Sequence, residues 1–595
     1  MALGEAFADV VILGGRVLSV HTGTFTGDGI AIKGNRIAAL GDVDYTIGSG
    51  TEVIDASGQT LVPGLVSPHV HQWHSGQNGT VWAQCHLLAG TTAAADGFYG
   101  CGIIAGVRGI RFFLDEVLRT PLKLLFLVPT LCYAQTRAFG FPVTPEAPTA
   151  EETLEMLTWS EALGLEETGY ELLLQPDGRR DPDMVRIVEQ CLAMGKVVTG
   201  HGPSFASERE LNAYLAAGFT NNHEIVSVEE ATRQAELGMH ILLRDAPALH
   251  DLPQAVRAVT ERRQDARAFQ ICPDLATAKS LFEGQIDVAI RTAIRCGLDP
   301  IRALQMATIQ PAEYFRVSEE IGSIAPGRFA DIVFLDDLRD FTIRRVIADG
   351  ERVVEDGKLV KELPKPDYPD WLYETFHLSR SFSAEDFHAR VPVEADEATV
   401  RVIAITETSI DSAEEHHVLP VHDGVIQADA AHGINKVVVL DRLHGRAEYG
   451  VGFVRGFSLR AGAIGQTVNF NQCVVAVGVD DSELACAVNE MVARRGGYVA
   501  VRDGRILAEL ATPLLGQASD LPYEPAKARA EAVAVAWRDL GCAMESPMTQ
   551  LEFVCASTMP TLRLSHLGLS RVSLDESGGI DLKSYGVVPL VVTTG

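Results

Sequence analysis

The sequence predicts an α/β protein built around a (β/α)8 barrel, with a small composite β domain and a C-terminal α+β domain beside it. From residue 62 to residue 324, short apolar strands alternate with helical patterns, which is the rhythm and length of such a barrel. Before and after that segment, the chain changes to short β-rich runs separated by glycine turns. At 595 residues, the chain is long enough to form several domains with separate cores.

The segments flanking the predicted barrel have a β texture. Residues 1–61 contain short strands with hairpin signals at Gly14-Gly15 and Gly34-Asn35, and β-rich runs return at 325–362. We expect these two segments to combine into one composite β domain. Residues 363–385, rich in proline and aromatic residues, are a predicted connector, and 386–595 form the predicted α+β domain.

Charge and cysteine content restrict the classes of partner. The chain has 50 basic and 79 acidic residues, a net charge of −29, which disfavours binding to nucleic acid or to an anionic membrane surface. Its 10 cysteines form no CxxC pair, and no apolar run is long enough to cross a membrane. These features predict a cytoplasmic protein that acts on a small molecule.

A pair of histidines ends the first predicted barrel strand. Side chains alternate along a strand, so His69 and His71 project to the same face, where two imidazoles can bind one divalent cation. A βα unit takes about 30 residues. By that spacing, the ends of strands 4, 5, 6 and 8 carry further metal-ligand residue types, namely Glu167, His201, His223 and Asp274.

In barrels of this kind, catalytic groups lie at the C-terminal ends of the strands. Four histidines and two carboxylates meeting there can hold two divalent metal ions (Zn, Mn or Fe), with one carboxylate as a bridge. Taken singly, each residue also has an ordinary interpretation. His201 and His223 are equally compatible with core or surface histidines, and Glu167 with a solvated loop acid.

Several ordered motifs resemble the adenine deaminase family of the amidohydrolase superfamily, over nearly the whole chain. In the barrel segment they are residues 63–71, 200–203, 211–218, 222–224, 306–308 and 324–331, and in the last segment 451–457 and 462–464. The resemblance implies a binuclear metal site, hydroxide attack on an sp² carbon, and a homo-oligomeric enzyme.

By that resemblance, the metal ligands fall on His69, His71, Glu167, His201, His223 and Asp274. Glu167 and Asp274 are the expected catalytic carboxylates, and Asp274 would take a proton and return it to the leaving nitrogen. Glu171 is close enough in the sequence to be a rival for the role of Glu167.

The chain departs from the family motifs around these ligands. Gln72-Trp73-His74-Ser75 replaces an Ile-Glu-Ser-Ser run, and Phe98-Tyr99 replaces a His-Glu pair. We therefore predict a substrate pocket lined by Trp73, His74, Phe98 and Tyr99, although ordinary packing at the barrel mouth is the competing interpretation for the three aromatic residues. A further metal ligand is one interpretation of His74, but a histidine that supports the ligands without binding metal, or a solvated histidine, is the favoured one.

Loss of polar groups that read a purine favours a different substrate, since such losses cost orders of magnitude in discrimination. The leading hypothesis is a metal-dependent amidohydrolase that cleaves a C–N bond in an amide, a lactam or an amino-heterocycle other than adenine. One alternative is a true adenine deaminase, which converts adenine to hypoxanthine and ammonia. A further alternative is a non-catalytic metal-binding relative with a role in assembly or regulation.

Overall fold

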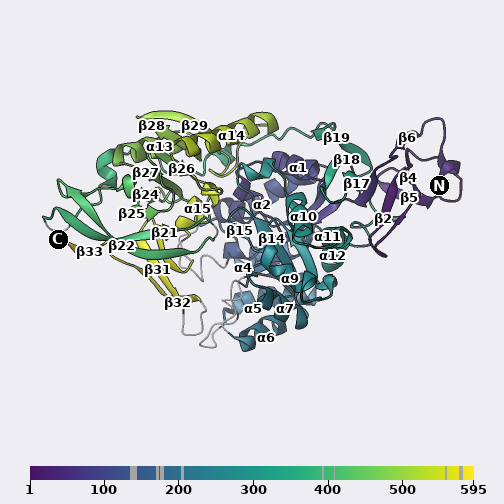
Figure 1. Ribbon diagram of the computed structural model, residues 1–595, viewed down its shortest axis with the longest axis horizontal. Helices are drawn as coiled ribbons and strands as arrows, with labels where there is room; N and C mark the ends of the chain where they lie inside the picture. Colours follow the sequence, from purple (N-terminus) through teal and green to yellow (C-terminus); the bar gives the residue numbers. More distant parts are fainter. Residues whose placement is uncertain are drawn as a thin grey trace.

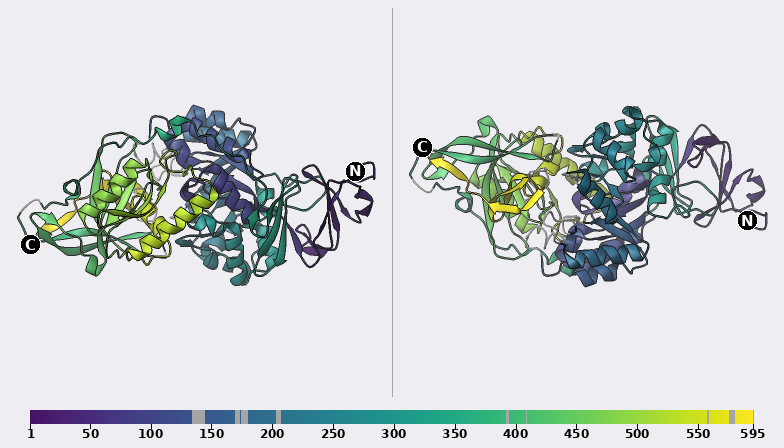
Figure 2. Two further views of the ribbon diagram at one scale, coloured as in Figure 1. Left: turned by 90° about the horizontal axis from the view of Figure 1, so that it is seen from above. Right: turned by 90° about the horizontal axis from the view of Figure 1, so that it is seen from below.

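The computed structural model describes residues 1–133, 144–168, 173, 180–202, 207–391, 394–407, 409–556, 559–574 and 580–594. Three regions follow one another along the long axis, with the chain termini at opposite ends (Figure 1). A β region holds the N-terminus, the barrel lies in the middle, and the C-terminal region forms the other end. The two further views show the same order (Figure 2). No helix within the described ranges is long and apolar enough to span a bilayer.

The N-terminal β region contains two sheets, and one of them joins distant parts of the chain. The first has the order β5-β4-β1-β6, and the second has the order β20-β19-β18-β17-β7-β2-β3. Because β7 pairs antiparallel with β17, with Pro63 opposite Ile332, strands before and after the barrel share one sheet. Their bounds are β1 Val10–Leu13, β2 Arg16–Ser19, β3 Thr24–Thr26, β4 Gly29–Lys33, β5 Arg36–Gly41, β6 Glu52–Asp55, β7 Thr60–Pro63, β17 Ile332–Asp337, β18 Thr342–Ala348, β19 Glu351–Glu355 and β20 Lys358–Leu359.

Two curved groups of parallel strands form the barrel wall. Five strands run in the order β12-β11-β10-β9-β8, and β14 pairs in parallel with both β13 and β16. A short hairpin strand, β15, extends β14. The bounds are β8 Leu65–Ser67, β9 Thr91–Asp96, β10 Lys123–Pro129, β11 Ala162–Thr168, β12 Val197–Gly200, β13 Asn221–Asn222, β14 His240–Ala246, β15 Leu249–His250 and β16 Phe269–Cys272.

Backbone hydrogen bonds join the last strand of the barrel to the segment after the first. The N–H of His71 donates to the carbonyl of Asp274 at 3.1 Å, and the N–H of Asp274 donates to the carbonyl of His69 at 3.3 Å. Two predicted metal-binding segments, from opposite ends of the barrel sequence, are thereby fixed beside each other.

Helices cover the outside of the strands, as the alternating pattern predicts. Helix α5, for example, starts at Pro182 and has Asp181 as its N-cap. The described helices of this region are α1 Gly79–Leu88, α2 Tyr99–Leu118, α4 Ala150–Met156, α5 Pro182–Ala193, α6 Glu208–Ala216, α7 Val228–Glu236, α8 Leu252–Ala255, α9 Arg257–Thr260, α10 Ile286–Arg295, α11 Pro300–Met306 and α12 Ile309–Tyr314.

The C-terminal region is built on a large mixed sheet whose central strands are buried on both faces. Its strand order is β23-β22-β21-β25-β24-β27-β26-β28-β29, with β33 paired to β21, and β30-β31-β32 form a smaller sheet. Strand bounds are β21 Glu397–Ile405, β22 Ser412–His422, β23 Val425–Ile426, β24 Ile434–Leu440, β25 Tyr449–Arg455, β26 Ala463–Gln466, β27 Val474–Gly478, β28 Gly497–Arg502, β29 Arg505–Ala511, β30 Thr561–Ser565, β31 Gly568–Leu574, β32 Ile580–Val587 and β33 Val591–Thr594.

Period-2 alternation in the strands explains why helices pack on both faces of this sheet. Val438 and Ala476 share a core with helix α13 (Asp481–Ala493). Their neighbours Val437 and Val475 point to the other face and join the core that contains Leu551 of helix α15 (Pro547–Val554). Helix α14 (Tyr523–Asp539) packs beside β28 and β29. The core of α15 is continuous with that of the barrel, and Figure 1 shows α15 between the two regions.

The loop after the first barrel strand contacts the C-terminal region directly. Gln77 and Ser519 form a parallel β-bridge, in which the N–H of Ser519 donates to the carbonyl of Gly76 at 2.9 Å. The amide of Asn78 donates to the carbonyls of Ser519 and Leu521 at 2.9 and 3.0 Å. The loop that follows the His69 and His71 pair is therefore held by both regions.

Candidate metal centre and substrate pocket

The six predicted metal-binding side chains come together at the C-terminal ends of five barrel strands. His69 and His71 follow β8, Glu167 is the next-to-last residue of β11, and His201, His223 and Asp274 follow β12, β13 and β16. These are the first, fourth, fifth, sixth and eighth strands in chain order. All are buried except His201, which is partly exposed. Glu171, the rival of Glu167, lies outside the described residues.

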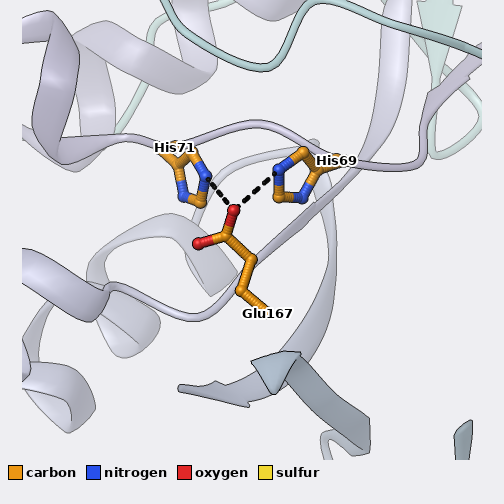
Figure 3. A group of neighbouring side chains, drawn as sticks. All are labelled: His69, His71 and Glu167. Carbon is orange, nitrogen blue, oxygen red and sulfur yellow. Dashed lines mark ion pairs between the residues drawn. The ribbon is translucent and has the colours of Figure 1, made fainter. Parts of the chain in front are cut away.

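One carboxylate oxygen lies at the middle of the cluster. Oε1 of Glu167 is 3.3 Å from Nε2 of His69 and 3.4 Å from Nε2 of His71. Dashed lines mark both contacts in Figure 3. The same oxygen is 3.2 Å from Nε2 of His223 and 3.7 Å from Nδ1 of His201. Oδ1 of Asp274 is 3.3 Å from Nε2 of His69. Two carboxylates and four imidazoles therefore turn their ligand atoms toward one small volume.

These separations fit a metal centre. Two ligands bound tetrahedrally at 2.0–2.1 Å from a zinc ion lie about 3.4 Å apart. Three overlapping groups of donors, each within 4.8 Å of one another, arise from these residues: His69-His71-Glu167, His69-His223-Asp274 and Glu167-His201-His223. Nε2 of His69 is buried and has no hydrogen-bond partner among the described residues. The donor set is thus suited to divalent cations, with Glu167 shared between two of the groups.

The cluster creates a field that favours positive charge. Burial lowers the pKa of His69, but the nearby carboxylates of Asp274 and Glu167 outweigh it and raise the pKa to about 10. For His71, burial is likewise outweighed by Glu167, and its pKa is raised to about 9. Burial opposes ionisation of Glu167, yet the surrounding histidines hold its pKa well below the usual range. A site that attracts protons this strongly attracts metal cations for the same electrostatic reason.

Two of these residues have an unusual backbone conformation. Glu167 and Asp274 have φ angles of 37° and 54°, in the left-handed region that non-glycine residues seldom adopt. Such strain is concentrated at functional sites, where it fixes the direction of a side chain. Here it accompanies two neighbouring carboxylates that face the same histidines.

Arg244, which was not predicted as a site residue, lies near the end of β14 beside the cluster. Its guanidinium is buried and lies 2.5 Å from Glu224, 3.2 Å from Oδ2 of Asp274 and 2.5 Å from Asp251. Glu224 in turn is 3.4 Å from Nε2 of His223. A charged residue directly after the apolar run Ile241–Leu243 was the available signal, since this is the seventh strand. Arg244 balances three carboxylates, among them Asp274.

Two buried carboxylates hold the loops after the first two barrel strands. They belong to Asp96 and Glu166, which were not predicted as site residues either. Asp96 accepts hydrogen bonds from the N–H groups of Gln72 and Phe98 at 2.8 and 3.0 Å. Glu166 accepts one from the N–H of Gly97 at 2.8 Å. Oε1 of Glu166 is 3.9 Å from Nδ1 of His71, on the other side of the ring from Glu167. Both buried carboxylates therefore lie behind the first pair of candidate ligands.

Three of the four predicted pocket residues meet beside the metal centre. The rings of Trp73 and His74 are 3.6 Å apart, and those of Trp73 and Tyr99 are 5.7 Å apart. The His74 ring is 5.4 Å from that of His71. Phe98 is fully buried in the main core and makes no ring contact with these residues within the described part of the chain.

The C-terminal region supplies residues to the same place. The Phe470 ring lies 6.1 Å from Trp73, 6.2 Å from His74 and 6.0 Å from Tyr99. Oε1 of Glu552, on α15, lies 2.6 Å from Nδ1 of His74. Neither residue has a local sequence signal, because each enters the site only through the docking of one region on another.

A cavity of about 230 Å³ opens between the barrel and the C-terminal region. Pro273 and Leu275, the neighbours of Asp274, line it, together with Pro547 and Met548 in the first turn of α15. The cavity thus lies between the segment that carries Asp274 and the helix that carries Glu552.

Comparisons with known proteins agree with this arrangement. Residues 60–353 match the amidohydrolase family, and residues 410–576 match the adenine deaminase C-terminal domain. An adenine deaminase of Moorella thermoacetica is 37% identical over 573 residues, which cover 96% of this chain and 95% of that protein. The chain belongs to the adenine deaminase family. As a member, it is a metal-binding amidohydrolase that acts on a C–N bond.

Other family members are comparably similar. The adenine deaminase of Paracoccus denitrificans is 32% identical over 599 residues, which cover 100% of this chain and 97% of that protein. Among solved structures, a β-aspartyl dipeptidase of Fervidobacterium islandicum AW-1 aligns with 60% of this chain and 99% of its own, with 19% identity and a TM-score of 0.46. The predicted family resemblance is confirmed, and so is the predicted barrel fold.

Proposed function

We propose that this family member catalyses the hydrolytic deamination of an amino-substituted heterocycle, with adenine as the leading substrate. The observation that carries the proposal is the convergence of four histidines with Glu167 and Asp274 at the C-terminal barrel edge. Full-length relatives named adenine deaminase support adenine, the alternative in the sequence analysis, better than an amide, a lactam or another heterocycle. The family assignment gives no support to a non-catalytic role.

In this proposal, His69, His71, Glu167, His201, His223 and Asp274 would hold two divalent cations, and Glu167 would be the carboxylate shared between them. Zn, Mn and Fe all suit such a donor set. Divalent cations supply Lewis-acid chemistry, because they lower the pKa of water and so provide a nucleophile near neutral pH. The distance of 3.2 Å between Glu167 and His223, and the shared position of Oε1, support a bridging role.

The protein's own acid–base group would be Asp274. Its carboxylate faces His69 with Oδ1 and Arg244 with Oδ2, and the strained backbone fixes its direction. Asp274 would take one proton from the attacking water and return it to the leaving nitrogen, so that the bond between the ring carbon and that nitrogen breaks and ammonia departs. The second proton of the water moves to the adjacent ring nitrogen, and the ring carbon becomes a carbonyl. Trp73 and Tyr99 would hold the flat heterocycle beside this group.

Ammonia release tests the proposal. Protein loaded separately with Zn, Mn or Fe is incubated with adenine, other amino-heterocycles, amides and lactams, and ammonia or acid is measured. We expect ammonia from adenine at a rate above that from every other compound. Turnover of an amide or lactam, with none of adenine, would favour the aromatic-pocket hypothesis based on Trp73, Phe98 and Tyr99.

We also propose that the protein is cytoplasmic and that it forms a homo-oligomer. All 10 cysteines are free thiols, which supports a reducing compartment such as the cytoplasm. The predicted homo-oligomer is tested by light scattering of the metal-loaded protein.

A further inference from the structure

A helix of the C-terminal region brings a buried carboxylate to the substrate side of the site. In α15, Leu551 and Val554 are buried in the core shared with the large sheet. Glu552 follows Leu551 by one residue, so its side chain is rotated by about 100° around the helix. It lies against His74 of the barrel and is 4% exposed. The carboxylate is therefore fixed by the packing of two regions.

Among the described residues, Glu552 forms an ion pair with His74 alone. Nδ1 of His74 lies 2.6 Å from Oε1 of Glu552, and both side chains are buried. No arginine or lysine is paired with Glu552 within the described residues, in contrast to Asp274, which Arg244 balances. Burying a carboxylate is unfavourable unless it is paired and hydrogen-bonded. Oε1 of Glu552 is buried and has no hydrogen-bond partner among the described residues, although an ionised carboxylate accepts several bonds.

The surrounding groups form a wall suited to a flat polar ring. Trp73, Tyr99 and Phe470 lie with their ring centroids 5.7–6.1 Å apart. The indole nitrogen of Trp73 and the hydroxyl of Tyr99 are buried without a hydrogen-bond partner among the described residues. The wall therefore offers aromatic faces together with polar atoms that protein groups leave unpaired, next to His71, whose ring is 5.4 Å from that of His74.

We propose that Glu552 is a substrate-binding residue, which accepts a hydrogen bond from a ring N–H of the heterocycle on the edge away from the leaving amino group. His74 is a positioning residue that orients this carboxylate. This inference deepens the proposed function and rests on it. It assigns to the C-terminal region a direct part in substrate recognition, and it selects heterocycles that present a ring N–H donor.

The charge of the wall also disfavours one class of substrate. A substrate carrying its own carboxylate would place a negative charge near Glu552, with which no arginine or lysine among the described residues is paired. Repulsion between like charges in a buried site is strong because the surroundings screen it poorly. A neutral purine meets no such penalty, and its imidazole N–H matches an acceptor.

The experiment compares wild type with Glu552→Gln and Glu552→Ala, using adenine, 7-methyladenine and 9-methyladenine. Both methylated compounds lack the imidazole-ring N–H. We expect Glu552→Gln to raise KM for adenine roughly 10- to 100-fold with a smaller change in kcat, since a charge-assisted hydrogen bond is lost. Wild type should prefer adenine over both methylated compounds, and the preference should shrink in both variants.

A matched control is Glu483→Gln. Glu483 is a buried glutamate of the same region, on α13, and accepts a hydrogen bond from the N–H of Asp503. Its substitution should leave KM and the preference among the three compounds unchanged. Metal content and the thermal midpoint are measured for every variant. Calorimetric titration with hypoxanthine gives a second reading, in which Glu552→Gln should weaken binding as it raises KM.

The outcomes separate the two levels of the proposal. If wild type releases ammonia from adenine while Glu552→Gln keeps the wild-type KM and hypoxanthine affinity, the inference about Glu552 is wrong and the proposed function stands. Equal turnover of adenine and both methylated compounds by wild type would overturn the inference without needing any variant. If wild type releases no ammonia from any heterocycle, both proposals fail.

Discussion

The barrel edge and the C-terminal helix α15 both supply charged groups to the site, but they hold them in different ways. His69, Glu167 and Asp274 are attached to strand ends that backbone hydrogen bonds fix within one sheet system. Glu552 and Phe470 reach the same place through contacts between regions. From this difference we infer that the barrel residues catalyse the reaction and that the C-terminal region binds the substrate. Changes in the first should lower kcat, and changes in the second should raise KM.

The largest effect is expected from Asp274→Asn. The amide keeps the shape and one ligand oxygen but cannot take up the proton, so kcat should fall by roughly 10²- to 10⁴-fold. Steady-state kinetics on adenine and metal analysis of the same sample measure it. Wild-type kcat with full metal content would remove Asp274 from the mechanism and weaken the assignment of chemistry to the barrel edge.

Arg244→Met should be the most damaging change outside the candidate ligands. It leaves Glu224, Asp251 and Asp274 buried without their shared cation. Breaking a buried ion pair by removing one partner costs about 3–5 kcal/mol. Thermal unfolding of the metal-free protein should show a lowered midpoint. Arg186→Met, in which an exposed ion pair with Glu151 is lost, is the control and should leave the midpoint unchanged.

Asp274 and Arg244 also show how much of the site could be predicted from the sequence. Period-2 alternation and strand spacing indicate His69, His71 and Asp274, because a barrel ties position in the chain to position around its edge. Arg244 obeys the same rule at the end of the seventh strand and was open to prediction. Glu552 could not be predicted in this way. Residues 547–554 form an ordinary helix, and only the contact with His74 in the folded structure shows that Glu552 belongs to the site.

The same contrast holds for the fold: the barrel could be predicted from the sequence, and the strand order of the C-terminal sheet could not. The barrel and its helices follow from local alternation of apolar strands and helices, and α5 begins at Pro182, a residue type that favours the first helical position. The arrangement of the large C-terminal sheet does not, because its order places β24 between β25 and β27, and β26 between β27 and β28. Such pairings depend on long-range packing that no short window of sequence contains.

Metal removal should have a smaller but measurable effect on stability. A ligand that binds only the folded state stabilises it by about 2.7 kcal/mol when present at 100 times its dissociation constant. Chelation should therefore lower the thermal midpoint of wild type, and addition of Zn, Mn or Fe should restore it together with ammonia release. In His223→Ala the restored shift should be reduced, because Glu167 and Asp274 lose a shared neighbour. An equal shift in wild type and His223→Ala would place the bound ion elsewhere.

The smallest expected effect comes from the contact that joins the two regions, and it tests whether docking alone matters. Asn78 has two functions: its side-chain oxygen caps α1 by accepting from the N–H of Val81, and its amide donates to Ser519 and Leu521. Asn78→Ala loses both, at about 1–3 kcal/mol of stability for the lost hydrogen bonds. Asn78→Ser keeps a capping oxygen and loses only the contacts with the C-terminal region.

Comparing the two Asn78 variants isolates the interdomain contribution. If α15 must be held against the barrel to read the substrate, Asn78→Ser should raise KM for adenine a few-fold while leaving kcat and metal content near wild type. The reason is that the loop containing Trp73 and His74 would then be held by fewer contacts opposite Glu552 and Phe470. A fall in kcat with unchanged KM would instead tie this loop to the metal ligands His69 and His71, and would remove the division between the two regions.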